Sequence, residues 1–196
     1  MFAYCGNDPK TYIDATGTRY VCLSTQLAGG LNYIYDQSNE EYADITFGNS
    51  TLSYSGCGAV ATYNALLSLG SRPSLENIVQ QYEQNDAFLL GGVAGISYRA
   101  LADYFADAGY NVSMYKETEL FDYFVSKSDA AIVWYTWANS GEMGMYFFHV
   151  DSTAGLNRGY NVYRGENAVR FLPSNLSDFF SGSNGKYAVL ICIDRK

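Results

Sequence analysis

The hydrophobic pattern of this chain changes once along its length, and that change constrains the fold more than any other feature. Between residues 57 and 108, apolar residues recur at helical spacing in segments that glycines and Pro73 separate. From residue 130 to residue 193, apolar, β-branched and aromatic residues form short runs, which are typical of buried strands. Helices followed by such strands indicate an α+β fold, with N-terminal helices packed on a C-terminal antiparallel sheet.

Glycines and serines mark the ends of the expected helices. A first helix is expected over Cys57–Leu69, because Gly70 follows its last apolar residue and Pro73 forbids its continuation. Ser74 is a suitable N-cap for a second helix, and a third helix begins near Ser97. Two shorter helices are expected at residues 118–126 and 176–180.

Short apolar runs predict the strands. Residues 154–159 indicate a hairpin turn, which would pair His149 with a residue near Tyr163 or Arg164 on the return strand. The expected strands are 18–23, 31–35, 110–115, 130–137, 145–153, 160–163 and 187–193.

Length and charge limit the domain count and the partners. A chain of 196 residues with 48% hydrophobic residues fits one domain, residues 1–196, with an N-terminal extension over 1–49 and a core over 50–196. The net charge of −8 and only 12 basic residues argue against nucleic acid and anionic membranes as partners. No apolar run reaches the roughly 20 residues that span a bilayer. The N-terminus has no leader pattern, so the compartment stays open: cytoplasmic, or extracellular if a leader was removed. The oligomeric state is not indicated.

The four cysteines do not form a metal-binding pattern. Cys5, Cys22, Cys57 and Cys192 have no CxxC spacing and no paired histidines, so we expect no zinc site, and no cofactor motif is present. Cys5 and Cys22 are open to two interpretations, a disulfide or two small buried side chains. Cys192 lies in an apolar run and is expected in the core.

One cysteine and the single histidine have the pattern of a nucleophile and its base. Cys57 lies between two glycines at the start of the first helix, where unpaired backbone N–H groups and the helix dipole favour a thiolate. His149 lies downstream in an aromatic, strand-like run. A thiol on a helix start and an imidazole on a remote strand are typical of thiol catalysis. Asp151 shares the strand face of His149 and could orient its ring, but an exposed hairpin carboxylate is the simpler interpretation.

These segments resemble the papain-like cysteine peptidases, and among them the C39-like branch. The resemblance covers roughly residues 50–193 and depends on the order of its elements along the chain. Those elements are Gly56-Cys57-Gly58-Ala59, a helix ending at Leu69-Gly70, a helix after Pro73 and a late strand carrying His149.

The resemblance implies a role for each matched residue. Cys57 would be the nucleophile and His149 the general base, acting on a peptide or another amide-containing substrate. The family usually has a glutamine shortly before the cysteine as an oxyanion donor. Here residues 49–53 contain none, and Asn49 is the amide at hand. The candidates for the residue that orients the histidine are Asn161, Glu166 and Asn167.

Three functions therefore remain open at this point. The first is a cysteine peptidase or related amide hydrolase that uses Cys57 and His149. The second is a catalytically silent papain-like module that binds a peptide or a partner, in which the two side chains are too far apart for a hydrogen bond. The third is an acyltransferase or transglutaminase-type enzyme with the same two residues.

Overall fold

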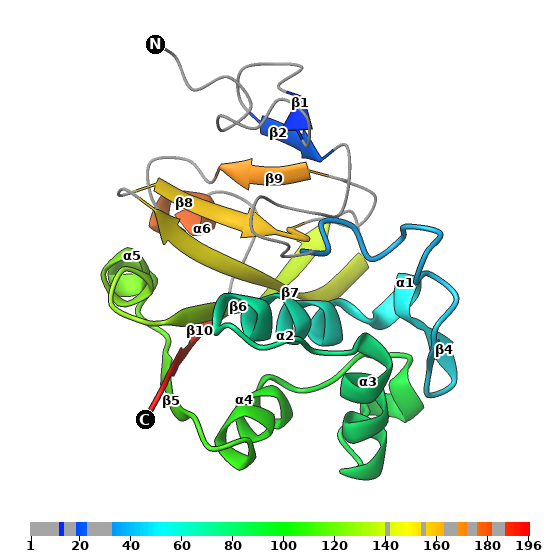
Figure 1. The fold of residues 1–196 in the computed structure, drawn as a ribbon. Helices are drawn as coiled ribbons and strands as arrows, with labels where there is room; N and C mark the ends of the chain where they lie inside the picture. The colour runs from blue at the N-terminus through cyan, green and yellow to red at the C-terminus, as the bar shows by residue number, and fades with distance from the viewer. Residues whose placement is uncertain are drawn as a thin grey trace.

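The computed structural model describes residues 33–139, 142–153, 156–162, 168–171, 176–181 and 187–196, together with the backbone of strands at 12–13 and 19–22. Eight strands form one sheet in the order β1-β2-β9-β8-β7-β6-β10-β5, and every neighbouring pair is antiparallel. Helices pack on both faces of this sheet (Figure 1). The α+β fold predicted from the sequence is therefore confirmed.

The strands of this sheet and of a small separate hairpin have the following bounds. The large sheet contains β1 Tyr12–Ile13, β2 Arg19–Cys22, β5 Asn111–Tyr115, β6 Ala130–Asn139, β7 Glu142–Thr153, β8 Leu156–Tyr160, β9 Ala168–Phe171 and β10 Tyr187–Asp194. The hairpin pairs β3 Thr46–Phe47 with β4 Ser50–Thr51.

The capping residues named in the sequence mark the end of α2 and the starts of α3 and α4. Ser74 accepts a hydrogen bond from Asn77 N at the start of α3, and Gly70 takes a left-handed φ of 82° after α2. Ser97 caps α4 by accepting from Ala100 N. The helices are α1 Leu52–Ser55, α2 Cys57–Ser68, α3 Leu75–Gln84, η2 Leu89–Gly92, α4 Tyr98–Asp107, η3 Thr118–Leu120, α5 Phe121–Val125 and α6 Leu176–Ser181.

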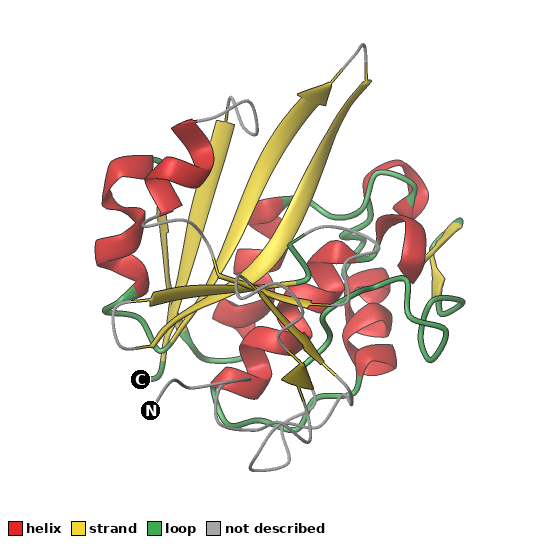
Figure 2. Ribbon diagram, turned by 90° about the horizontal axis from the view of Figure 1, so that it is seen from above, coloured by secondary structure: helices red, strands yellow, loops and turns green. Residues whose placement is uncertain are grey.

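Alternating residues of the central strands face two hydrophobic clusters. On β6, Ile132 and Trp134 pack in the cluster that contains α2, α3 and α4. Val133 and Tyr135 belong to the opposite cluster, with residues of α5 and α6. Figure 2 shows α5 and α6 apart from the other helices, with strands of the sheet between them. Cys192 is 2% exposed in this second cluster, as expected for a core residue.

Two local predictions were wrong, and one short helix was not predicted. The return strand β8 begins at Leu156 and not at Tyr160, so His149 pairs with Tyr160 and not with a residue near Tyr163 or Arg164. The helix that was not predicted is α1, which ends at Ser55, and Gly56 is the turn residue between α1 and α2. Residues 33–35, the described part of another expected strand, are not in a strand, because the Asn64 side chain pairs with both backbone groups of Ile34 at 2.8 Å.

Some residues that the sequence analysis singled out lie outside the part of the chain that the structure describes. The Cys5–Cys22 disulfide hypothesis concerns residues that are not fully described, and Glu166 and Asn167 are not described either.

Within the described residues, no helix combines the length and hydrophobicity of a transmembrane helix. Over the same part of the chain, no three His, Cys, Asp or Glu side chains gather as metal ligands do.

Candidate functional site

Cys57 is the first residue of α2, and its thiol is buried. The residue is 6% exposed and lies in the cluster that contains α2, α3 and α4. Burial raises the pKa of the Cys57 thiol to about 11, although backbone N–H groups of Phe147, Gly58 and Cys57 oppose this rise. Helix position alone predicted a lowered pKa, but desolvation outweighs the helix N-terminus here. The thiol is therefore protonated at neutral pH.

His149 lies in the middle of β7, and both of its ring nitrogens have hydrogen-bond partners. Nδ1 is 2.8 Å from the carbonyl oxygen of Ala131, and Nε2 is 2.8 Å from the hydroxyl oxygen of Ser68. Because a carbonyl oxygen only accepts, Nδ1 of the neutral ring carries the proton and Nε2 accepts the Ser68 hydroxyl proton, for which the carbonyl oxygen of Asn64 is a more distant acceptor at 3.3 Å. The lone pair that a general base would use is thus occupied.

Ser68, the partner of Nε2 of His149, and Cys57 lie at opposite ends of one helix. Cys57 begins the twelve-residue helix α2 and Ser68 ends it. At the rise of an α-helix, these two ends are about 16 Å apart. Backbone atoms of Phe147 approach the sulfur, whereas the His149 ring reaches the far end of α2. The structure does not bring Cys57 and His149 into hydrogen-bonding contact.

The surroundings of His149 favour the neutral imidazole. The residue is 0% exposed, and burial lowers the pKa of the ring, with the charge of Asp151 opposing this effect. Asp151 does not bond to the ring. It accepts hydrogen bonds from Arg158 Nε at 3.0 Å and from Tyr160 Oη at 2.8 Å. The rings of Tyr33 and Tyr160 stack beside the imidazole.

Asn161 and Asn49, the two described residues that were predicted to complete the site, have other hydrogen-bond partners. Asn161 does not orient His149, because its amide bonds to Gln37 and its Oδ1 also accepts from Tyr146 Oη. Asn49 lies against the loop of η2, where its backbone N–H donates to Gly91 O at 2.7 Å.

Sequence reasoning missed Gln37, a buried amide at the centre of a polar network. Gln37 is 1% exposed and its Nε2 donates to the carbonyl oxygens of Leu52 and Ser53, at the start of α1. Its Oε1 accepts from Tyr146 Oη at 3.0 Å and from Asn161 Nδ2 at 3.1 Å. Both protons of the Gln37 amide are used by backbone carbonyls, so this amide holds α1 in place. Gln37 was missed because the family's glutamine was expected in residues 49–53, shortly before Cys57.

No protein-family model matches the chain. No characterised protein matches it at significant similarity.

Proposed function

We propose that this chain is a non-catalytic module that binds polypeptides, on an α+β scaffold similar to that of the papain-like peptidases. The observation that carries the proposal is the bonding of His149. A thiol–imidazole mechanism needs the lone pair of the base at the thiol, but Nε2 of His149 accepts from Ser68 at the far end of α2.

The state of the thiol supports the same conclusion. With a pKa of about 11, only about one Cys57 in 10⁴ is a thiolate near pH 7. The nucleophile is scarce, and the residue that would generate it is bonded elsewhere.

Exposed apolar side chains support a binding role. Leu90 is 82% exposed, Val93 is 46% exposed and Tyr54 is 63% exposed. Contiguous segments that display large apolar side chains are typical of interaction surfaces. A polypeptide can cover such side chains and gain their burial.

A cysteine peptidase, or an acyltransferase with the same two residues, is the second candidate. It is favoured by the backbone N–H groups of Phe147, Gly58 and Cys57, which surround the sulfur as donors to an anion would. This candidate requires His149 to leave Ser68 and Ala131 and to approach Cys57.

Alkylation by iodoacetamide, followed residue by residue by mass spectrometry, separates the two candidates. In a binding module, Cys57 and Cys192 label at similarly slow rates, because burial raises the pKa of both thiols to about 11. His149→Ala leaves the rate at Cys57 unchanged. Ser68→Ala is the sharper variant, because it releases Nε2 of His149. If Ser68→Ala speeds labelling of Cys57 but not of the buried Cys192, or if an electrophilic peptide probe modifies Cys57 in a His149-dependent way, the chain is an enzyme and the proposal fails.

A further inference from the structure

One end of the molecule displays apolar side chains on two segments that are joined through their backbones. Asn49 N–H donates to Gly91 O at 2.7 Å, and the Phe47 and Phe88 rings lie 4.5 Å apart beneath this contact. Gly48 has a φ of 59°, and a Cβ there would overlap the Gly91 carbonyl, so the hairpin and the η2 loop pack backbone to backbone.

Three exposed apolar side chains belong to the segments at this end, and we refer to them as the η2 face: Tyr54, Leu90 and Val93. Tyr54 belongs to α1, which is joined to the same loop because the backbone oxygen of Ser55 closely approaches Gly95. Figures 1 and 2 agree in placing the β3–β4 hairpin at the end of the molecule opposite α5.

Neither packing nor backbone geometry accounts for a leucine at position 90. Its φ of 50° and ψ of 44° lie in the left-handed region, which disfavours a bulky side chain. At 82% exposure, the side chain also gains little from burial in this molecule. Glycine or asparagine would suit the backbone better. An apolar side chain held outward at a strained position is typical of a contact that a partner covers.

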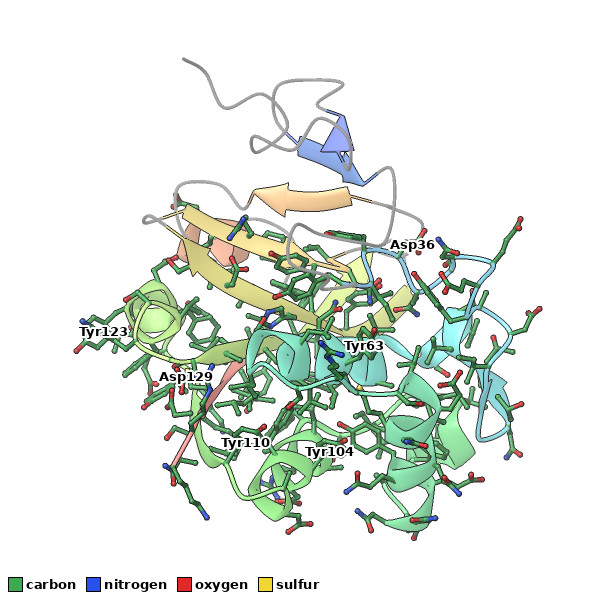
Figure 3. All side chains as sticks on the ribbon, viewed as in Figure 1. Asp36, Tyr63, Tyr104, Tyr110, Tyr123 and Asp129 are labelled. Atoms are coloured by element: carbon green, nitrogen blue, oxygen red, sulfur yellow. The ribbon has the colours of Figure 1, made fainter. Side chains whose placement is uncertain are left out.

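The part of the chain that contains this face has a strongly one-sided charge. Residues 33–98 contain seven acidic residues and one basic residue, so this third of the chain carries −6 of the net charge of −8. The acidic residues are Asp36, Glu40, Glu41, Asp44, Glu76, Glu83 and Asp86, and the basic residue is Arg72. All of these acidic residues except Asp36 are exposed, and Figure 3 shows Asp36 at the same end of the molecule as α1.

Two of these acidic residues lie near the apolar residues, one along the chain and one through backbone hydrogen bonds of its neighbours. Asp86 precedes Leu90 by four residues. Asp44 lies between Ala43 and Ile45, whose carbonyl oxygens accept from Ser53 N and Leu52 N at the start of α1. The segments that carry the η2 face therefore combine exposed apolar side chains with a net negative charge.

We propose that the η2 face binds a cationic polypeptide segment that carries apolar side chains. This inference rests on the proposed function, since it names the partner of a binding module. Lysine or arginine of the partner meets the carboxylates, and its apolar side chains cover Leu90, Val93 and Tyr54. A second copy of this chain would bring like charges together, and an anionic membrane would be repelled.

Fluorescence anisotropy with the full chain tests the proposal. The probe is a labelled peptide that repeats the triplet Leu-Lys-Gly. Two matched peptides, repeating Ser-Lys-Gly and Leu-Glu-Gly, remove the apolar side chain or reverse the charge. We expect the Leu-Lys-Gly peptide to bind about tenfold or more tightly than either control, and its affinity to fall as salt rises.

Variants locate the contact. Leu90→Gly suits the backbone at that position and should weaken binding about tenfold, since it removes the most exposed apolar side chain of the face. Tyr54→Ser should weaken binding, whereas Tyr123→Ser should not. Tyr123 is 59% exposed, and Figure 3 shows it on α5 at the other end of the molecule from Asp36.

Two outcomes overturn the inference. One is equal affinity for the Leu-Lys-Gly and Leu-Glu-Gly peptides. The other is binding that Leu90→Gly does not change. Neither outcome bears on the thiol, whose reactivity tests the proposed function separately. A His149-dependent reactive Cys57 would remove the proposed function even if the cationic peptide bound.

Discussion

Nε2 of His149 lies 2.8 Å from Oγ of Ser68, the last residue of α2. The Oη of Tyr33 lies 3.0 Å from the same Oγ, and since Ser68 donates to His149, Tyr33 donates to Ser68. The chain of hydrogen bonds continues from Nδ1 of His149 to the carbonyl oxygen of Ala131. The single histidine of the sequence thus joins the segment before α1, the end of α2 and strands β6 and β7.

Removing the Ser68 hydroxyl is expected to destabilise the fold. Ser68→Ala leaves Nε2 of His149 without its partner in a site that is 0% exposed, which costs about 1–3 kcal/mol. Urea unfolding measures the loss. Ser113→Ala on the edge strand β5 is the control, because Ser113 is exposed. Equal midpoints for the two variants would show that the hydrogen bond does not contribute.

The lowered pKa of His149 predicts a loss of stability in mild acid. Above about pH 6.5, the imidazole is neutral in both the folded and the unfolded chain, so its contribution is fully present. As the pH falls from there through the folded pKa, the unfolded chain takes up a proton that the buried ring does not. The stability of the fold then decreases.

A variant without a titrating ring isolates this effect. His149→Gln is neutral throughout, so its free energy of unfolding should change less between about pH 7 and about pH 5 than that of the wild type. The same carboxylates are present in both proteins, and the charge of Asp151 opposes the lowering of the His149 pKa by burial. Parallel pH profiles for the two proteins would mean that His149 is not a buried neutral residue.

Local signals in the sequence predicted the helices well, because each depends on neighbouring residues. The caps Ser74 and Ser97 bond to the amides three residues ahead, and Gly70 supplies the left-handed residue after α2. The change of hydrophobic pattern predicted helices followed by an antiparallel sheet, because this pattern too depends on residues that are close together in the chain.

The site was harder to predict, because it depends on distances between remote segments. The order of Cys57 and His149 along the chain contains no information on how α2 lies along β7. Only two residues separate β7 from β8, and this short connection makes Tyr160 the partner of His149. The contact between Gln37 and Asn161 joins residues 124 apart, so no local pattern could indicate it.

Asn161 is expected to be sensitive both to the loss of its amide and to its backbone conformation. It is 0% exposed, has a φ of 58°, and bonds to Gln37 N at 3.0 Å through its Oδ1. Asn161→Gly still allows the left-handed backbone conformation but loses these hydrogen bonds, at a cost of about 2 kcal/mol. Asn161→Ala adds about 1 kcal/mol, because alanine disfavours the left-handed region. Urea unfolding of both variants tests this order, and an alanine variant as stable as the glycine variant would contradict it.

Leu90→Gly is expected to stabilise the folded chain although it removes a large side chain. The left-handed conformation of Leu90 costs a non-glycine residue about 1–2 kcal/mol, and glycine offsets part of this gain by its greater freedom when unfolded. Because Leu90 is 82% exposed, little burial is lost. We expect a net gain of roughly 0.5–1 kcal/mol, measured by thermal or urea unfolding.

Val93→Gly is the matched control on the same loop. Val93 is 46% exposed but has a φ of −62° and a ψ of −34°, which suit any L-residue. Glycine there brings its entropic cost and also loses the buried part of the valine side chain, so it should destabilise the fold by at least about 0.5–1 kcal/mol. The two substitutions therefore have opposite signs if strain at Leu90 is real. A stabilised Leu90→Gly variant that binds the cationic peptide more weakly would show that this leucine is retained for contact at the expense of stability. Destabilisation by both substitutions would mean that the Leu90 side chain contributes to the fold itself.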